Sequence, residues 1–212
     1  MKTATAEIAA TLFTRHPELE PLADTLASAT DALCACHKRD GLVLLCGNGG
    51  SAADAGHIAG ELLKGFLLPR PPSPEQTPAL TRELGDAALA AKLQRGIRAV
   101  NLCEASAIMT ATANDQSPDL IFAQQVFALG RSGDILIGLS TSGNALNVAR
   151  ALQVARASGM RTIGFTGACP SRMDALCDLL FKVPETETFK VQELHLPLYH
   201  ALCAMVESEC FG

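Results

Sequence analysis

The run GDILIGLSTSGNALNVARAL, residues 133–152, decides the fold of this chain of 212 residues. Residues 134–140 read DILIGLS, and their continuous apolar centre is too short for a typical helix and typical of a strand that is buried on both faces. Apolar residues then recur at helical spacing from about residue 144 to 158, and a second apolar run follows at 161–166. Strand, helix and strand in this order predict a βαβ unit with a right-handed crossover and two parallel strands.

The same alternation continues on both sides of this unit. The apolar run LVLLC at 42–46 predicts another strand, and residues 97–102 and 179–183 are weaker strand candidates. Helices are expected at about 17–38, 51–65, 121–129 and 188–209. We therefore predict an α/β fold: a single doubly wound, mainly parallel five-stranded sheet flanked by helices, with a helical N-terminal segment over residues 1–40.

The length favours one domain over residues 1–212, but one stretch breaks the alternation. Five of the eleven prolines lie between Pro69 and Pro78, before a helix-like segment that runs to about residue 95. We interpret residues 67–95 as an inserted surface loop or lid with a helix, which is mobile or packs across a neighbour.

The composition is that of a globular protein, with 48% hydrophobic and 18% charged residues. A formal net charge of −5 gives nucleic acids and anionic membranes no overall attraction. No apolar stretch approaches the roughly 20 residues that span a bilayer, and the first 20 residues lack a signal-peptide core. We expect a soluble, cytoplasmic protein with neither a nucleic-acid nor a membrane partner.

The chain contains eight cysteines, and no two of them form a CxxC pair or a repeated spacing. Scattered cysteines of this kind indicate buried, reduced thiols rather than disulfides or a thiolate metal site. They occupy positions 34, 36, 46, 103, 169, 177, 203 and 210.

The turn after the second strong strand has the chemistry of a phosphate site. Ser140, Thr141 and Ser142 place three hydroxyls at the expected start of a helix, where Gly143 lets the backbone approach a ligand closely. Hydroxyl and N–H donors at the positive end of a helix can surround a phosphate without a lysine. The alternative is an ordinary helix cap, which needs only one hydroxyl.

The turn after the first strong strand, Gly47-Asn48-Gly49-Gly50-Ser51-Ala52, satisfies the GxGxxA pattern of dinucleotide-binding proteins. That pattern also calls for an acidic residue about 20 positions on, at the end of the next strand. Here this distance falls in the proline-rich stretch, so we expect no nucleotide cofactor.

Two helices carry candidates for acid–base or metal chemistry. His57 and Glu61 lie four residues apart on one face, as a base or metal-ligand pair or as a solvated surface pair. Gln192 and His200 lie about 80° and about 12 Å apart on a straight helix, too far to bind one ion. Either Pro197 distorts the helix, or the two residues serve different copies of the site across an oligomer interface. We interpret His195 as a helical residue whose hydrogen bonds are satisfied.

Four runs in the chain resemble the sugar isomerase (SIS) domain family: CGNGGSAADAGHIAGEL, ATANDQSPDLIFAQQV, GDILIGLSTSGNALNVARAL and VQELHLPLYHAL. The resemblance covers about residues 42–66 and 97–209, and within the family it points to the sedoheptulose 7-phosphate isomerases of bacterial heptose synthesis. It implies an aldose–ketose isomerase that converts sedoheptulose 7-phosphate to D-glycero-D-manno-heptose 7-phosphate through an enediol or enediolate.

The resemblance also implies roles for individual residues. Glu61 would move the proton between C1 and C2, and His200 would act as acid at the oxygens. The phosphate and the sugar would be bound by Ser140, Thr141, Ser142, Asn48, Gly49, Gly50, Ser51, Asn114, Asp115 and Gln192. One zinc per site would be held in some members by the residues that match His57, Glu61, Gln192 and His200. The family is usually homotetrameric, with sites between subunits.

The chain departs from the family pattern in two places. Ala145 replaces the Ser or Thr that normally ends the phosphate turn, and the insertion at 67–95 is longer than in the heptose isomerases. One rival function is a non-enzymatic SIS protein that associates with the bacterial replication initiator, although that relative lacks the glutamate and the late histidine. A second is a phosphosugar-sensing domain, although the chain has no DNA-binding extension.

Overall fold

The computed structural model describes residues 1–212 and has one sheet of five strands at its centre. All neighbouring strands pair in parallel, in the order β2-β1-β3-β4-β5. The strands are β1 (Val43–Cys46), β2 (Ala99–Asn101), β3 (Ile135–Leu139), β4 (Arg161–Thr166) and β5 (Leu179–Lys182). The predicted fold is confirmed, and the sheet is parallel throughout.

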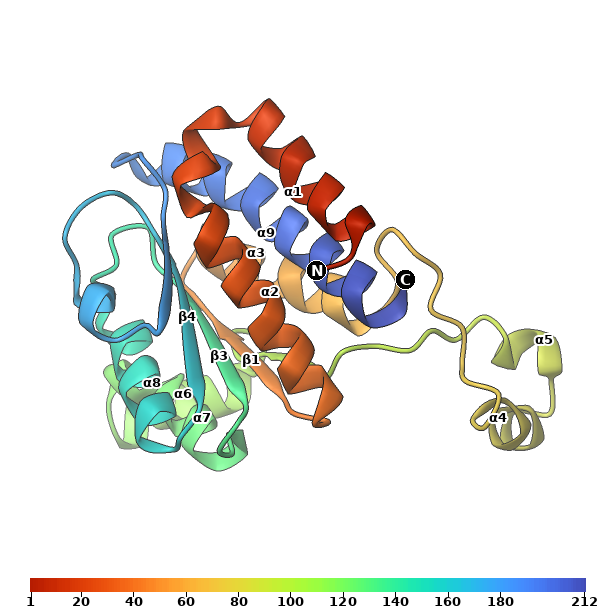
Figure 1. Cartoon of the computed structure of the whole chain (residues 1–212). Helices are drawn as coiled ribbons and strands as arrows, with labels where there is room; N and C mark the ends of the chain where they lie inside the picture. The colour runs from red at the N-terminus through yellow and green to blue at the C-terminus, as the bar shows by residue number, and fades with distance from the viewer.

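Helices cover both faces of the sheet, so the molecule has three layers (Figure 1). One face packs against α2 (Ala23–Lys38), α3 (Gly50–Leu63) and α9 (Thr188–Phe211), with α1 (Thr3–Arg15) packed on α9. The other face packs against α7 (Ala123–Leu129) and α8 (Leu146–Ala157).

The two cores explain why β1 and β3 are apolar at every position. Successive side chains of a strand point to opposite faces of the sheet. Leu45 and Ile137 therefore lie in the larger core, whereas Leu44 and Leu136 lie in the smaller core on the other face. All four are fully buried, as a parallel sheet with two covered faces requires.

The helix boundaries differ from the prediction where proline or the turn geometry intervenes. The N-terminal segment contains α1 and then a 3₁₀ helix, η1 (Pro17–Leu22), because Pro21 has no N–H to give to an α-helix. Further along, α6 (Ser106–Asp115) was not predicted, and two more 3₁₀ turns are present, η2 (Pro118–Leu120) and η3 (Arg172–Ala175). None of the helices combines the length and the apolar character that crossing a membrane requires.

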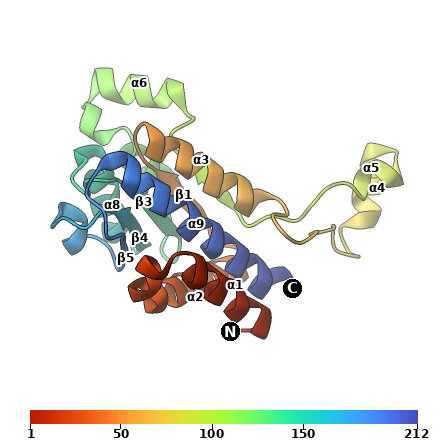
Figure 2. The same ribbon diagram turned by 90° about the horizontal axis from the view of Figure 1, so that it is seen from above.

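Residues 67–95, which the prolines mark as an insertion, form an arm that extends away from the three layers (Figures 1 and 2). The arm carries α4 (Thr77–Leu84) and α5 (Ala87–Ala90), which pack chiefly against each other. No residue of α4 is buried. In a single chain, therefore, the arm does not cover the sheet or the turns that follow its strands.

Candidate active site

In the strand order β2-β1-β3-β4, the connection after β1 leads to β2 on one side of the sheet, and the connection after β3 leads to β4 on the other side. Ligands of open α/β sheets bind at such a reversal, beyond the carboxyl ends of the two strands. The turn from Gly47 to Gly50 follows β1, and the turn from Ser140 to Asn144 follows β3. Both candidate turns therefore meet at the expected position.

A pair of asparagines joins the two turns. Asn48 and Asn147 exchange hydrogen bonds in both directions, each with an N–O distance of 2.9 Å. Asn147 lies in the first turn of α8 and was not among the predicted site residues. The sequence feature that could have identified it is the GNALN run, in which Asn147 lies three residues after Asn144.

The glycines after β1 create space for the late helix. Gly49 has φ +55°, a conformation that favours glycine, and Gly50 begins α3. A Cβ atom at position 50 would collide with the side-chain amide of Gln192. Gln192 of α9 therefore packs directly on this turn, and Ser51 is buried beneath it.

The three hydroxyls after β3 do not cap the helix that follows. α8 begins at Leu146 rather than at residue 144, and its N-cap is Ala145, which has no side-chain acceptor. Asn144 instead braces the turn, because its Oδ1 accepts from the backbone N–H of Arg172 at 3.1 Å. Gly143 has φ +64°. The capping alternative is therefore wrong, and the chemistry of the turn stays available for an anion.

Three titratable side chains meet where α3 and α9 pack together. Nε2 of His57 lies 3.2 Å from Oε1 of Glu61 and 3.3 Å from Nε2 of His200. The exposed fractions of the His57 and Glu61 side chains are 43% and 17%, so the imidazole is open to solvent whereas the carboxylate is largely buried. Burial and the neighbouring His57 lower the pKa of His200, and Glu61 only partly opposes this. His200 is therefore neutral near pH 7.

A chain of hydrogen bonds behind His57 determines which nitrogen carries its proton. The hydroxyl of Tyr199 donates to Oδ1 of Asp54 at 3.2 Å, so its oxygen accepts from Nδ1 of His57 at 3.0 Å. Nε2 of His57 then faces both Oε1 of Glu61 and Nε2 of His200. Burial raises the pKa of Asp54, although the hydrogen bond from Tyr199 lowers it.

Asp54 and Tyr199 were not predicted as site residues. Two signals were available: Asp54 lies three residues before His57, and Tyr199, the only tyrosine of the chain, directly precedes His200.

The late helix continues through Pro197, so a break at this proline does not explain the separation of Gln192 and His200. α9 runs from Thr188 to Phe211 through Pro197. Gln192 contacts the start of α3, whereas His200 contacts its third turn at His57. The alternative explanation, an interface between copies of the chain, stays a prediction.

The structure does not bring Asn114 and Asp115 to the two turns. They end α6 with exposed side chains and bond to each other, from Nδ2 of Asn114 to Oδ1 of Asp115 at 2.7 Å. No hydrogen bond connects either residue to the β1 or β3 turn.

The donor set around His57 fits zinc in kind and in part of its geometry. In a tetrahedral zinc site with bonds of about 2.0–2.1 Å, two ligand atoms lie about 3.3 Å apart. Nε2 of His57 lies at nearly this distance from both Oε1 of Glu61 and Nε2 of His200. However, no three His, Cys, Asp or Glu side chains are grouped as a complete metal site. Binding would require small movements of Glu61 or His200, with Nε2 of both histidines unprotonated.

Two further expectations need correction. Nε2 of His195 lies 3.4 Å from the carbonyl oxygen of Thr166, but its buried Nδ1 has no partner, so His195 is only half satisfied. Burial lowers its pKa to about 4. All eight cysteines are free, but only four are buried: Cys103, Cys177 and Cys210 are half-buried, and Cys169 is exposed in the loop after β4.

Comparisons with known proteins agree on one family. The sequence model of the SIS domain family matches residues 9–96 and 89–167. The phosphoheptose isomerase of Burkholderia pseudomallei is 42% identical over 193 residues, which cover 91% of this chain and 86% of that protein. The phosphoheptose isomerase of Rhodospirillum rubrum is 39% identical over 204 residues, which cover 96% of this chain and 94% of that one.

The fold also matches a solved structure along nearly its whole length. The phosphoheptose isomerase GmhA from Neisseria gonorrhoeae superposes with a TM-score of 0.73 at 33% identity, over 97% of both chains.

Proposed function

Because the chain belongs to the SIS domain family and is a sugar-phosphate isomerase, we propose that it converts sedoheptulose 7-phosphate to D-glycero-D-manno-heptose 7-phosphate. The observation that carries this proposal is the meeting of Glu61 and His200 at His57, in a fold with a hydroxyl-rich turn. The names of the relatives support a heptose phosphate as substrate. The enzyme is therefore favoured over the non-enzymatic binding protein and the phosphosugar-sensing domain.

The two catalytic side chains supply what an aldose–ketose isomerisation needs. The carboxylate of Glu61 removes a proton from C1 of the ketose, and the C2 carbonyl oxygen takes a proton from His200, which leaves an enediol. Glu61 then returns the proton to C2, while the C1 hydroxyl gives its proton to His200 and becomes the aldehyde. The lowered pKa of His200 keeps its imidazole neutral, with one N–H that it can donate in the first of these steps.

The phosphate would be held by the hydroxyls of Ser140, Thr141 and Ser142 at the positive end of α8. Asn48, Gly49, Gly50, Ser51 and Gln192 would contact the sugar, and the Asn48–Asn147 pair keeps the two turns together. The absence of a hydroxyl at Ala145 removes one donor from the phosphate.

A complete site would need more than one chain. A groove of about 970 Å³ between α1, α9 and residues 66–68 is lined by His200 but by no residue of the phosphate turn. Asn114 and Asp115 bond to each other and form no hydrogen bond with either turn. This separation supports a homotetramer with sites between subunits, in a cytoplasm that keeps the thiols reduced.

Zinc is part of the proposal as one ion per site. His57, Glu61 and His200 would hold it, with Gln192 from a neighbouring copy as the fourth ligand. When bound, it would polarise the substrate oxygens as a Lewis acid.

Replacing Glu61 with glutamine tests the assignment. Glu61→Gln keeps the size of the side chain but removes the base, so turnover should cease while sedoheptulose 7-phosphate still binds. Proton NMR in D₂O measures deuterium incorporation next to the carbonyl, and calorimetry measures binding.

Glu18→Gln, at an exposed position on η1, is the matched control and should behave like the wild type. Unchanged turnover in Glu61→Gln would refute the role of Glu61, and absence of exchange with any phosphoketose in the wild type would refute the isomerase proposal.

A further inference from the structure

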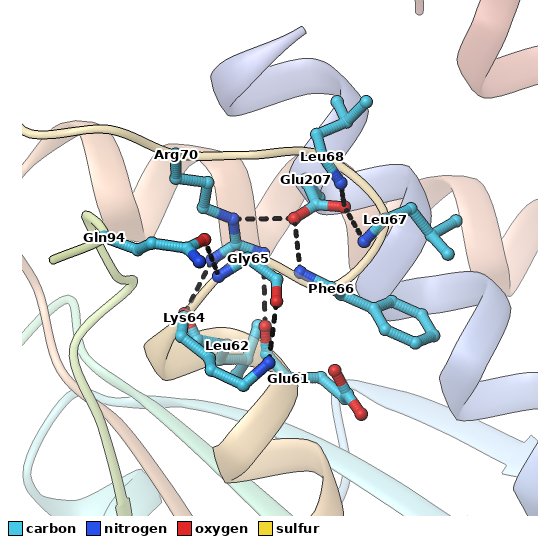
Figure 3. A network of polar contacts seen from close by, with 10 residues as sticks. All are labelled: Glu61, Leu62, Lys64, Gly65, Phe66, Leu67, Leu68, Arg70, Gln94 and Glu207. Carbon is cyan, nitrogen blue, oxygen red and sulfur yellow. Dashed lines mark hydrogen bonds and ion pairs between the residues drawn. The ribbon is translucent and has the colours of Figure 1, made fainter. Parts of the chain in front are cut away.

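An ion pair lies buried where the arm joins the body of the molecule (Figure 3). Nε of Arg70 is 2.7 Å from Oε1 of Glu207, and the exposed fractions of the two residues are 1% and 0%. Burying two charges costs free energy that their attraction often fails to recover unless further hydrogen bonds complete the site. The other hydrogen bonds of Arg70 and Glu207 therefore decide whether the buried pair is stable.

Arg70 binds the last turn of the helix that carries the catalytic base. Its Nη2 donates to the carbonyl oxygen of Glu61 at 3.1 Å, and its Nη1 donates to that of Leu62 at 2.9 Å. The final carbonyls of a helix have no partner within it, and they favour a nearby cation. The guanidinium thus closes α3 at the residue whose side chain reaches His57.

Glu207 binds the backbone that immediately follows α3. Its carboxylate accepts from the N–H groups of Phe66, Leu67 and Leu68 at 2.8, 2.7 and 2.9 Å. The ring of Phe66 then lies against the other catalytic residue, with its centroid 5.6 Å from that of His200. His200 and Glu207 are seven residues apart, or two turns, so both face this segment from α9.

The geometry points to Arg70 and Glu207 as positioning residues for the isomerisation, which set the distance between Glu61 and His200. Neither touches the reacting atoms. One end of the pair holds the backbone of Glu61, and the other holds the backbone of Phe66, whose ring lies beside His200. The kinetic part of this inference rests on the proposed function, because it assumes that Glu61 and His200 act on the same substrate.

The root of the arm offers a control for this inference. Where the chain returns from the arm, the N–H of Arg95 donates to the carbonyl oxygen of Arg70, and Nε of Arg95 donates to that of Pro71 at 2.9 Å. Arg95 thus supports the same junction as Arg70 but has no contact with Glu61, Phe66 or Glu207.

The test separates positioning from stability with Arg70→Met, Glu207→Gln and the double variant. Each single change leaves a buried charge unpaired and should lower the melting temperature. The double variant removes both charges, and the single amide oxygen of its glutamine can still accept from Leu67 and Leu68 but not from Phe66, so part of the loss should be recovered. We expect its kcat for sedoheptulose 7-phosphate to stay roughly 10- to 100-fold below the wild type, with KM changed less than about 3-fold. Arg95→Met should keep the wild-type kcat.

A second measurement needs no turnover. The Cε1 proton of His200, assigned by its loss in His200→Gln, should change its NMR shift in the double variant because the ring of Phe66 moves. It should not change in Arg95→Met.

Recovery of both the melting temperature and kcat in the double variant would show that the pair serves stability alone and would overturn the inference. If the wild type does not convert sedoheptulose 7-phosphate, the proposed substrate fails, and the NMR shift decides the inference by itself. An unchanged His200 resonance in the folded double variant would then overturn it.

Discussion

At the scale of single residues, the site depends on side chains that never touch a substrate. Tyr199 accepts from His57 and donates to Asp54, which leaves Nε2 of His57 free to face Glu61 and His200. The second oxygen of Asp54 is buried without a partner, so Tyr199 provides the only hydrogen bond to this carboxylate. A partner of this kind orients a ligating histidine and strengthens it as a donor.

Removing that hydroxyl should weaken the proposed binding of zinc. We expect Tyr199→Phe to lower the affinity for Zn²⁺ about 10- to 100-fold, as measured by calorimetry on metal-free protein, because Nδ1 of His57 loses its acceptor. Ser208→Ala is the control: it removes another buried hydroxyl of α9, which accepts from Thr5 at 2.9 Å, far from His57 in the sequence of the helix. Equal Zn²⁺ affinity in Tyr199→Phe and the wild type would contradict the role of Tyr199.

At the scale of elements, the start of α8 is the part of the site that departs most from a standard helix N-terminus. Ala145 has the backbone angles φ −57° and ψ 116° at the N-cap, where a side-chain oxygen normally accepts from the first turn. Asn147 partly compensates, because its Oδ1 accepts from the N–H of Val148 while it also bonds Asn48. The helix is therefore joined to the β1 turn by the same residue that braces its first turn.

A serine at this N-cap should strengthen both the helix and the phosphate site. We expect Ala145→Ser to raise the free energy of unfolding by about 0.5–2 kcal/mol and to lower KM for the phosphosugar, because the hydroxyl accepts from α8 and donates to phosphate. Denaturant unfolding and steady-state kinetics measure the two effects. Ala157→Ser adds a hydroxyl at the other end of α8 and should produce neither. A higher KM in Ala145→Ser would place the phosphate elsewhere.

At the scale of the whole molecule, the arm is the part that a single chain does not explain. Its helices expose Leu84 and Leu89, and Leu93 is exposed on the returning segment. Their apolar surface has no cover within the chain, since α4 and α5 pack chiefly against each other (Figure 2). A neighbouring subunit would bury it.

Light scattering coupled to gel filtration should show a particle of four chains of 22.2 kDa each. Replacing residues 73–92 with a short glycine linker keeps Arg70 and Arg95 but removes both arm helices. We expect this variant to form smaller particles, because the arms no longer reach across to a neighbour. A monomeric wild type would contradict the tetramer, and an unchanged mass in the variant would contradict the role of the arm.

Local patterns in the sequence determined the strands, most helices and the elements of the site. The apolar runs at 42–46 and 134–140 predicted β1 and β3, and the i, i+4 spacing predicted that His57 and Glu61 share a face, because both depend only on the period of a strand or helix. The glycine and hydroxyl turns followed from their place after those strands.

Only the tertiary structure decided how these parts combine. Asn48 and Asn147 are 99 residues apart, Arg70 and Glu207 are 137 apart, and Asp54 and Tyr199 are 145 apart. Such contacts are absent from any local periodicity, since they depend on the strand order and on α9 crossing α3. The sequence alone therefore identified Glu61 and His200 as candidates, whereas the packing of α9 against α3 brought both to His57 and placed a buried ion pair behind them.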